Sequence, residues 1–445
     1  MANWPEITAF TIFFGVLVLI ITERIHLTIA AFLGAMLLIF LHVLTLEEAI
    51  SYIGKSHATL ALFFGVMVMV RAFEPTNIFA YLATQMVFRA RGEGKRLLLG
   101  IVAITTPICA VLPNATTVML LAPLIPPMAQ EINVNFVPLL ILMVFVANSA
   151  GLLTLVGDPA TFIVGDAINL SFLDYLLKLS LGGVVALATI VALLPILFRP
   201  IWNTKLANLD QLPHPVINHP RMLALGGVII ALVLVLFVVG ESLPIPISPA
   251  AVALLGAALC LLLTHHSGID SVQPILRDVD WSTLVFFMSI FVLIGGLQHT
   301  GVISHAADGL TFILGKNLIL GTLLLLVATG LLSSVIPNIP LVVAMVPMLK
   351  EYLVTANLAG PELLSQGFAG QVPPETFPLF VAMMFGATLG GNGTLVGASS
   401  NIVAAGIAEQ HGKSISFQTF LAYGLPMMTL QLITIAGFVA VRFLF

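Results

Sequence analysis

The chain has little charge and almost no cysteine. Among its 445 residues, 8% are charged, 59% are hydrophobic, and the formal net charge is −4. A soluble domain has roughly 25% charged residues, so the composition excludes a soluble globular protein and predicts a polytopic membrane protein. The two cysteines, Cys109 and Cys260, both lie inside apolar runs, which argues against a disulfide framework, a redox pair or a cysteine metal site. The charges form no basic patch, which excludes nucleic acid as a partner.

Motifs for catalysis and metal binding are also missing. The ten histidines have no HExxH or other metal spacing, and no Ser/Lys, Ser/His or paired aspartate motif is present. We therefore expect no cofactor, no resident metal and no enzyme activity. The first residues, MANWPEITAFTIFFG, lack a basic leader and a small-residue cleavage site, so we interpret them as a retained first span.

Apolar runs long enough to cross a bilayer, about 17 to 25 residues, predict ten membrane crossings. They lie near 7–22, 27–43, 57–73, 136–165, 172–198, 222–240, 248–265, 281–297, 376–409 and 417–442. The stretches 97–130 and 317–354 differ, because each has two arms of about 15 residues that reach only about 22 Å at 1.5 Å per residue. A hydrocarbon core is roughly 30 Å thick, so both stretches are predicted to be re-entrant hairpins. The expected fold class is an all-α polytopic membrane protein.

The sequence repeats itself at the points where helices are interrupted. Pro113-Asn114 returns as Pro337-Asn338, an offset of 224 in the numbering (337 − 113), and the tetrapeptide TLVG at 154–157 returns at 394–397, an offset of 240 (394 − 154). Paired interruptions of this kind are the sequence sign of a secondary transporter built from internal repeats. Each copy has five crossings and one hairpin. Because five is odd, the second copy must be inverted relative to the first, with one hairpin opening from each face and the two Pro-Asn tips meeting near the midplane.

This pattern divides the chain into two repeats and a linker. The first repeat is 1–198, with its hairpin at 97–130 and a broken helix at 136–165; the second is 222–445, with its hairpin at 317–354 and a broken helix at 376–409. A polar, Pro-rich cytoplasmic linker, 199–221, joins them.

The basic residues orient the predicted topology. If the loop that carries Arg89 and Arg96 is cytoplasmic, eleven of the 16 lysines and arginines fall on that side and five on the other. The positive-inside rule requires such a bias. Both termini are then expected to be external, in a bacterial inner (cytoplasmic) membrane.

Two predicted spans carry glycines and short polar side chains in their middle, which predicts a break in each helix. The runs are NSAGLLTLVGDP at 148–159 and GGNGTLVGASSN at 390–401. Non-helical backbone in a bilayer must be covered by protein or line a wet cavity, because each unsatisfied group costs several kcal/mol. Opened helices present N–H groups to anions and carbonyls to cations such as Na⁺. The simpler alternative is that small residues let helices pack closely.

Asp158 is the acidic residue of these breaks, and its counterpart in the second copy is Ala398. A carboxylate inside a span is costly unless it is paired, hydrated or protonated. We predict that Asp158 couples transport to H⁺ or Na⁺; a helix N-cap is the alternative and compatible role. Glu74, three residues after Arg71, is a second coupling candidate, for which an interfacial ion pair is the simpler interpretation.

The candidate substrate and ion ligands are polar or small residues at the hairpin tips and helix breaks. They are Asn114, Thr116 and Thr117 at the first tip, Asn338 at the second tip, Asn148, Thr154 and Gly157 at the first break, and Asn392, Gly393, Thr394, Ser399, Ser400 and Asn401 at the second. The expected partners are a small-molecule or ion substrate, H⁺ or Na⁺, and the lipid bilayer. The sequence does not decide whether the protein forms a homodimer.

The stretch GGNGTLVGASSNIVAAGIAEQHG at 390–412, followed by FQTFLAYGLPMM, resembles the melanosomal P-protein branch of the arsenical-pump and citrate-transporter-like permeases, within the ion transporter superfamily. LPNATT at 112–117, VGDPATFIVG at 156–165, FEPTNIFAYLA at 73–83 and IPNIP at 336–340 fit the same pattern. The resemblance implies inverted repeats with two hairpins and an elevator-like movement of a transport core against a scaffold. The family pattern usually reads GDPPN, whereas residues 157–161 here read GDPAT, so Thr161 stands where the family has asparagine. The family also usually has an acidic residue directly before the first tip asparagine, and here that residue is Pro113.

Together these features predict a secondary active transporter for a small anion or oxyanion, arsenite-like or a small carboxylate, coupled to H⁺ or Na⁺ by an elevator-type mechanism. The nearest alternative is a NhaD-like Na⁺/H⁺ antiporter, in which Asp158 would bind the transported cation. A passive anion channel is an alternative of another class. It would need a continuous polar pore, which two hairpins closing on the midplane disfavour.

Overall fold

The computed structural model describes residues 4–22, 24–205, 216–268, 271–365, 368 and 370–444. Its regular structure is helical, and the β pairing in these ranges is a single isolated bridge between Glu93 and Lys205. The predicted all-α class is therefore confirmed. The middle of the predicted linker, 206–215, lies outside the described residues.

The described part of the first half contains thirteen α-helices. They are α1 Trp4–Ile21, α2 Leu27–Phe40, α3 Leu46–Lys55, α4 His57–Phe73, α5 Ile78–Arg89, α6 Gly94–Cys109, α7 Asn114–Leu121, α8 Ile125–Glu131, α9 Phe136–Ala150, α10 Pro159–Ala167, α11 Phe172–Lys178, α12 Ser180–Leu197 and α13 Arg199–Trp202.

Ten α-helices follow in the described part of the second half. They are α14 Pro220–Val239, α15 Pro249–Ser267, α16 Val272–Arg277, α17 Trp281–His299, α18 Val302–Leu314, α19 Leu318–Ser333, α20 Asn338–Thr355, α21 Phe377–Gly390, α22 Ser399–Gln410 and α23 Phe417–Val439.

In the described residues, nine helices are long and apolar enough to cross a membrane, or up to eleven if each of two bent helix pairs counts as one span. The predicted number of crossings, ten, falls in this range, although α2 and α21, in two of the predicted crossings, are shorter apolar helices. Helix α20 passes the test although it was predicted as a hairpin arm, because it continues for 18 residues through Pro347. The matching arm of the first half is divided at Pro123 into α7, a 3-10 turn and α8. The further prolines of the IPPM run, Pro126 and Pro127, begin α8 without an N–H to donate to the preceding turn.

Equivalent helices recur at the offsets that the sequence showed. Helices α6 and α19 begin and end at an offset of 224 (318 − 94 and 333 − 109), and α10 and α22 begin at an offset of 240 (399 − 159). Packing repeats as well: α4 lies on α15 as α2 lies on α17, and α7 lies on α22 as α10 lies on α20. Each of these contacts joins one half of the chain to the other, so the two halves interlock.

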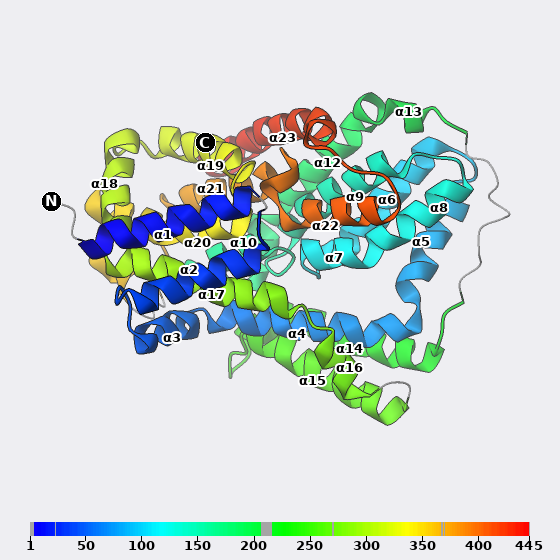
Figure 1. Ribbon diagram of the computed structural model, residues 1–445, viewed down its shortest axis with the longest axis horizontal. Coiled ribbons are helices and arrows are strands. Elements are labelled where there is room, and N and C mark those ends of the chain that lie inside the picture. The colour runs from blue at the N-terminus through cyan, green and yellow to red at the C-terminus, as the bar shows by residue number, and fades with distance from the viewer. Residues whose placement is uncertain are drawn as a thin grey trace.

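The helices divide into two bundles by their contacts. In Figure 1, α4, α14 and α15 lie along one edge of the molecule and α12 and α23 along the opposite edge. The scaffold bundle consists of α1, α2, α4, α14, α15 and α17, and the core bundle consists of α6, α7, α9, α10, α12 and α19 to α23. Within the core bundle, 89% of the span Phe136–Leu153 is buried, whereas 22% of Pro220–Ser242 in the scaffold bundle is buried. The α9 span is therefore enclosed by protein, and α14 presents most of its apolar surface to the outside, as a lipid-facing helix does.

Candidate functional site

Both hairpins turn at a proline followed by a buried asparagine. Pro113 and Pro337 have nearly the same backbone angles, φ −53° and ψ 141° against φ −52° and ψ 142°, and each precedes the first residue of a helix. Proline holds φ near −65° and keeps the residue before the helix extended. As a result Asn114 and Asn338 stand at the N-termini of α7 and α20, with 5% and 4% of their surface exposed.

Both broken helices open at a threonine that is bonded to the neighbouring hairpin. Thr154 and Thr394 have extended backbones, and their hydroxyls donate to the carbonyls of Ala110 and Ser334. These two acceptors are equivalent positions of the two halves, because they too are related by the offset of the hairpins. Each of these hydrogen bonds therefore joins a helix break to the hairpin turn in the same half of the chain.

The glycines of the two TLVG segments allow this close approach. A Cβ on Gly157 would lie 2.8 Å from the carbonyl oxygen of Cys109, and a Cβ on Gly397 would lie 3.1 Å from that of Ser333. Contacts under 3.0 Å to backbone cannot be accommodated without a shift, and those up to 3.4 Å are tight. The absence of a side chain at these two glycines lets the break lie against the hairpin turn.

The two hairpin tips meet at the carboxylate of Asp158, which is fully buried. Its Oδ1 accepts hydrogen bonds from the Nδ2 atoms of Asn114 and Asn338, each at 3.3 Å. Its Oδ2 accepts from the Thr388 hydroxyl at 3.2 Å and from the backbone N–H of Thr161 at 3.2 Å. The bond from the Thr161 N–H makes Asp158 the N-cap of α10, which is the alternative role predicted for it from the sequence. One carboxylate therefore contacts both tips and begins the second part of its own broken helix.

Asn148 connects the surroundings of Asp158 to the second break. Its Nδ2 donates to Oδ1 of Asn392 at 3.0 Å and to Oδ1 of Asn401 at 3.2 Å. Its Oδ1 accepts from Nδ2 of Asn114 at 3.0 Å and from the hydroxyl of Ser400 at 2.7 Å. All four partners are buried. A single amide from the first broken helix thus contacts the first tip and the second broken helix.

Sequence reasoning missed four residues of this polar cluster, namely Ser149, Thr161, Thr388 and Gln431. Gln431 of α23 accepts from Asn392 at 2.8 Å and donates to the Ser149 hydroxyl at 2.8 Å, while Thr388 donates to Asp158. Thr388 is related to Asn148 by the offset of the broken helices, 240 (388 − 148), so the repeat itself could have found it. Gln431 is an amide inside an apolar span, which is by itself a sign of function.

Besides Thr154, Thr394 and Gly157, which lie against the hairpin turns, four further predicted ligands lie outside this hydrogen-bonded cluster. Thr117 is buried on α7, and Thr116 faces a small gap toward α4. Ser399 is the first residue of α22 and is half-buried. A Cβ on Gly393 would lie 2.5 Å from the Met428 sulfur, so that glycine serves packing.

Charge is sparse in the polar cluster. Asp158 is its acidic member, and the hydrogen-bond donors of that carboxylate are amides, hydroxyls and a backbone N–H. The other coupling candidate, Glu74, lies elsewhere: it is half exposed and pairs with Arg71, Oε2 to Nη1 at 2.6 Å. In the described ranges no group of three or more His, Cys, Asp or Glu residues could hold a metal ion. A carboxylate surrounded by neutral donors can accept one proton or one monovalent cation, and either would remove its charge.

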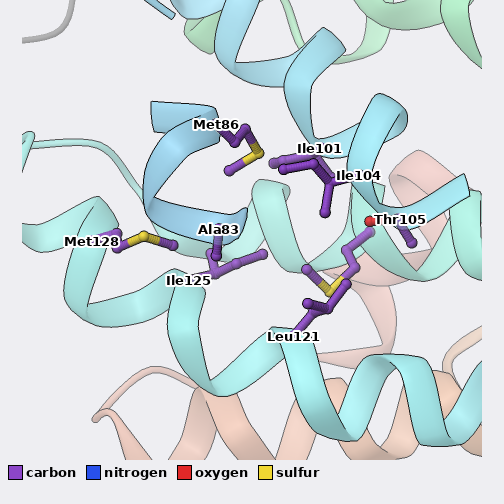
Figure 2. Close-up of a pocket in the computed structure, with 9 residues that line it drawn as sticks. Ala83, Met86, Ile101, Ile104, Thr105, Leu121, Ile125 and Met128 are labelled. Carbon is purple, nitrogen blue, oxygen red and sulfur yellow. The ribbon is translucent and has the colours of Figure 1, made fainter. Parts of the chain in front are cut away.

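A small cavity next to the first hairpin is lined mainly by apolar side chains, unlike the polar cluster around Asp158. Figure 2 shows the side chains of Met86, Ile101 and Met128 facing it from α5, α6 and α8, with the Thr105 hydroxyl as the polar group. Its volume is about 10 Å³. A water needs about 10–15 Å³ and two to four polar partners, so this cavity stays dry. The candidate site is the polar cluster around Asp158.

Known proteins resemble this chain along most of its length. The sequence model described as Citrate transporter (CitMHS) matches residues 17–369. An uncharacterized transporter of Synechocystis sp. is 68% identical over 440 residues, which cover 99% of this chain and 98% of that protein. An uncharacterized transporter of Mycobacterium tuberculosis is 32% identical, covering 98% of this chain and 99% of the relative. The human P protein is 29% identical over 94% of this chain, which spans 57% of that longer protein.

The fold has a solved neighbour. The crystal structure of the Alcanivorax borkumensis YdaH transporter, described as having an unusual topology, superposes with a TM-score of 0.61 at 13% sequence identity. The match covers 88% of this chain and 87% of that one. It agrees with a helical membrane transporter fold.

Proposed function

The chain belongs to the citrate transporter family, and on that premise we propose that it is a secondary active transporter for a small anion, coupled to H⁺ or Na⁺ through Asp158. A small carboxylate and an arsenite-like oxyanion are the substrate classes we put forward. The observation that carries this proposal is the meeting of both hairpin tips at one buried carboxylate.

Coupling follows from competition for the same donors. While Asp158 is ionised, the N–H groups of Asn114 and Asn338 point at its Oδ1. A proton or Na⁺ on this carboxylate removes its charge and weakens both hydrogen bonds, because bonds to ionised acceptors are about twice as strong as neutral ones. The amides then become available to an anionic substrate. Cation and anion binding favour each other in this scheme, as symport requires.

Movement of the site as one unit is supported by the packing of the core bundle. The tip helix of each hairpin lies on the second part of the other half's broken helix, α7 on α22 and α20 on α10. The substrate ligands therefore belong to one packed body, while the scaffold bundle packs largely within itself. We propose that the core bundle shifts against the scaffold bundle in an elevator-type cycle.

The organisation in the membrane is part of the same proposal. We propose that the repeats span 1–198 and 222–445, that both termini are external, and that the protein resides in a bacterial inner membrane. The bias of lysine and arginine toward one side supports this orientation.

A NhaD-like Na⁺/H⁺ antiporter is the second candidate function. It is favoured by the absence of any basic side chain among the hydrogen-bond partners of Asp158 in the part of the chain that the structure describes. In that case the carboxylate would carry the transported cation, and no anion would be needed.

One flux experiment separates these functions. The purified protein is reconstituted into proteoliposomes and tested with labelled citrate, succinate, phosphate and arsenite, with a pH gradient and a Na⁺ gradient imposed separately. We expect uptake of one anion class above that of protein-free liposomes, accelerated by one of the two gradients. Na⁺-dependent proton movement, followed with an internal pH dye and without uptake of any anion, would replace the proposal by the antiporter.

A further inference from the structure

A polar cavity of about 220 Å³ lies at the end of α4, apart from the polar cluster. It is lined by Arg71, Glu74 and Pro75 from the end of α4 and the turn that follows it, and by Pro274, Ile275 and Asp278 from α16 and its C-cap. The two linings come from different halves of the chain. The volume is below the roughly 300–1,000 Å³ of pockets for drug-sized ligands, and it suits a small organic anion.

Arg71 is fixed in this cavity from two sides. Its Nε donates to the backbone carbonyl of Asp278 at 2.9 Å, and its Nη1 donates to Oε2 of Glu74 at 2.6 Å. About a quarter of the Arg71 side chain, 26%, is exposed, and 51% of the Glu74 side chain is exposed. Within the described ranges, the other N–H groups of the Arg71 guanidinium have no protein partner. A fixed guanidinium with free donors suits a carboxylate or an oxyanion.

The same contact separates the cavity from the first hairpin. Arg71 and Asp278 also line a smaller gap of about 20 Å³, whose other walls include Thr116 and Leu120 of α7. Helix α7 begins at Asn114, which contacts Asp158. The bond between the Arg71 side chain and the Asp278 carbonyl therefore lies between the open cavity and the helix that carries the first tip.

The acidic residues around this cavity are already engaged, which disfavours a cation as its occupant. Glu74 is paired with Arg71, Asp278 is paired with the exposed Arg277 at 3.1 Å, and Asp280 caps α17. Among these described groups that line the cavity, Arg71 is the one with charged N–H groups that no protein atom accepts. An anion thus meets free N–H groups, whereas a cation would have to break an existing ion pair.

We propose that this cavity is an access vestibule for a small di- or tricarboxylate and that Arg71 is the residue that binds it there. Glu74 keeps its place on one N–H group of Arg71, and the substrate binds the remaining N–H groups before it passes α7. The vestibule determines which anions reach the polar cluster, and it deepens the proposed function on which it rests. Arg71 recognises a carboxylate group of its ligand as it now binds the side-chain carboxylate of Glu74.

Protection from phenylglyoxal, which modifies accessible guanidinium groups, tests the vestibule directly. The wild-type protein in detergent is treated with the reagent with and without citrate, and the modification of each arginine is followed by mass spectrometry of peptides. Arg277, the last residue of α16 and 77% exposed, is the internal control beside the cavity. At ten times the dissociation constant, one-site binding slows modification roughly tenfold. We expect slowing at Arg71 and none at Arg277.

Two variants and one matched control complete the test. Glu74→Gln removes a negative charge next to the bound anion and should strengthen citrate protection of Arg71. Arg71→Lys should raise the KM for citrate uptake with a smaller change in kcat, whereas the matched Arg277→Lys should change neither. Equal modification of Arg71 with and without citrate, in both wild type and Glu74→Gln, would overturn the vestibule.

The vestibule and the proposed function fail in different ways. In Asp158→Asn, citrate protection of Arg71 should persist although gradient-driven uptake is lost. Protection without any citrate uptake by the wild type would support the vestibule and count against citrate transport. Citrate uptake without citrate protection of Arg71 would support citrate transport and count against the vestibule.

Discussion

Asn114 and Asn338, equivalent positions of the two halves, donate to the same oxygen atom, Oδ1 of Asp158, at the same distance of 3.3 Å. One asparagine comes from each hairpin, while the carboxylate exists in the first half only, since Ala398 takes its place in the second. Two equivalent asparagines thus contact a carboxylate that has no equivalent in the second half. Ion coupling needs one titratable or cation-binding group at the centre, and this arrangement supplies one.

The first prediction concerns the two tip asparagines. Asn114→Ala and Asn338→Ala should each reduce initial uptake at least about tenfold, because a hydrogen bond to a charged group is worth roughly 1.5–3 kcal/mol and about 1.4 kcal/mol is a factor of ten. Uptake in proteoliposomes is the measurement, with size-exclusion elution as the control for folding. A large loss in one variant and none in the other would contradict the shared role.

The second prediction concerns the charge itself. Asp158→Asn should still exchange substrate across the membrane but should lose the acceleration given by an imposed pH or Na⁺ gradient, because the neutral amide cannot take up a proton or balance a cation. Counterflow and gradient-driven uptake are compared in the same vesicles. Complete loss of both would favour the NhaD-like alternative. Wild-type behaviour would leave Asp158 as a helix cap.

The third prediction uses Thr388, whose hydroxyl donates to Oδ2 of Asp158. Thr388→Val keeps the shape and removes the donor, so it should weaken ion dependence, and Thr388→Ser should restore it. The matched control is Thr322→Val, because the buried Thr322 hydroxyl bonds the carbonyl of Leu318 in its own helix, at 2.7 Å. The concentration of Na⁺ or H⁺ that gives half-maximal uptake is the readout. An equal shift in both valine variants would mean that the effect is packing.

The fourth prediction concerns the glycines of the breaks. Gly157→Ala and Gly397→Ala should each destabilise the fold by about 1–3 kcal/mol, as overpacking does, because the new Cβ meets backbone atoms of Gly151 or Gly391 at 2.9 Å. Gly227→Ala in α14 should be neutral or slightly stabilising, since nothing lies within 4 Å of its Cβ. Thermal unfolding in detergent measures the difference. Equal melting of all three would show that the breaks tolerate a side chain.

The fold class, the hairpin turns and the location of the polar residues could be predicted from the sequence because they depend on local signals. Pro-Asn pairs, glycine-rich runs and apolar lengths are read along the chain, and the structure places Asn114, Asn338 and Asp158 together. The sequence did not show that α7 packs on α22, because this contact joins segments from different halves of the chain and leaves no local signal.

Some differences between the predicted and the observed site also have a physical cause. Thr154 and Thr394 were expected as ligands because they are polar residues at a break, but their hydroxyls bond backbone carbonyls of the adjacent hairpins. Ser149 and Gln431 were overlooked because a single polar residue inside an apolar helix gives no repeat signal; Gln431 donates to the Ser149 hydroxyl, and both are buried in the cluster. A role in binding substrate or ion is still a prediction for each of these residues.

The interlocked halves have a consequence for the biogenesis of the protein. Ribosomes deliver the first half to the membrane before the second, so Asp158 enters the bilayer when Asn338 and Thr388 have not yet been synthesised. Until α20 and α21 arrive, the carboxylate has neither of these donors and remains costly to bury. Closure of the polar cluster is therefore a late event of assembly, and a nascent chain that stops before α20 contains the Asp158 carboxylate with its donors Asn114 and Thr161 but without Asn338 and Thr388.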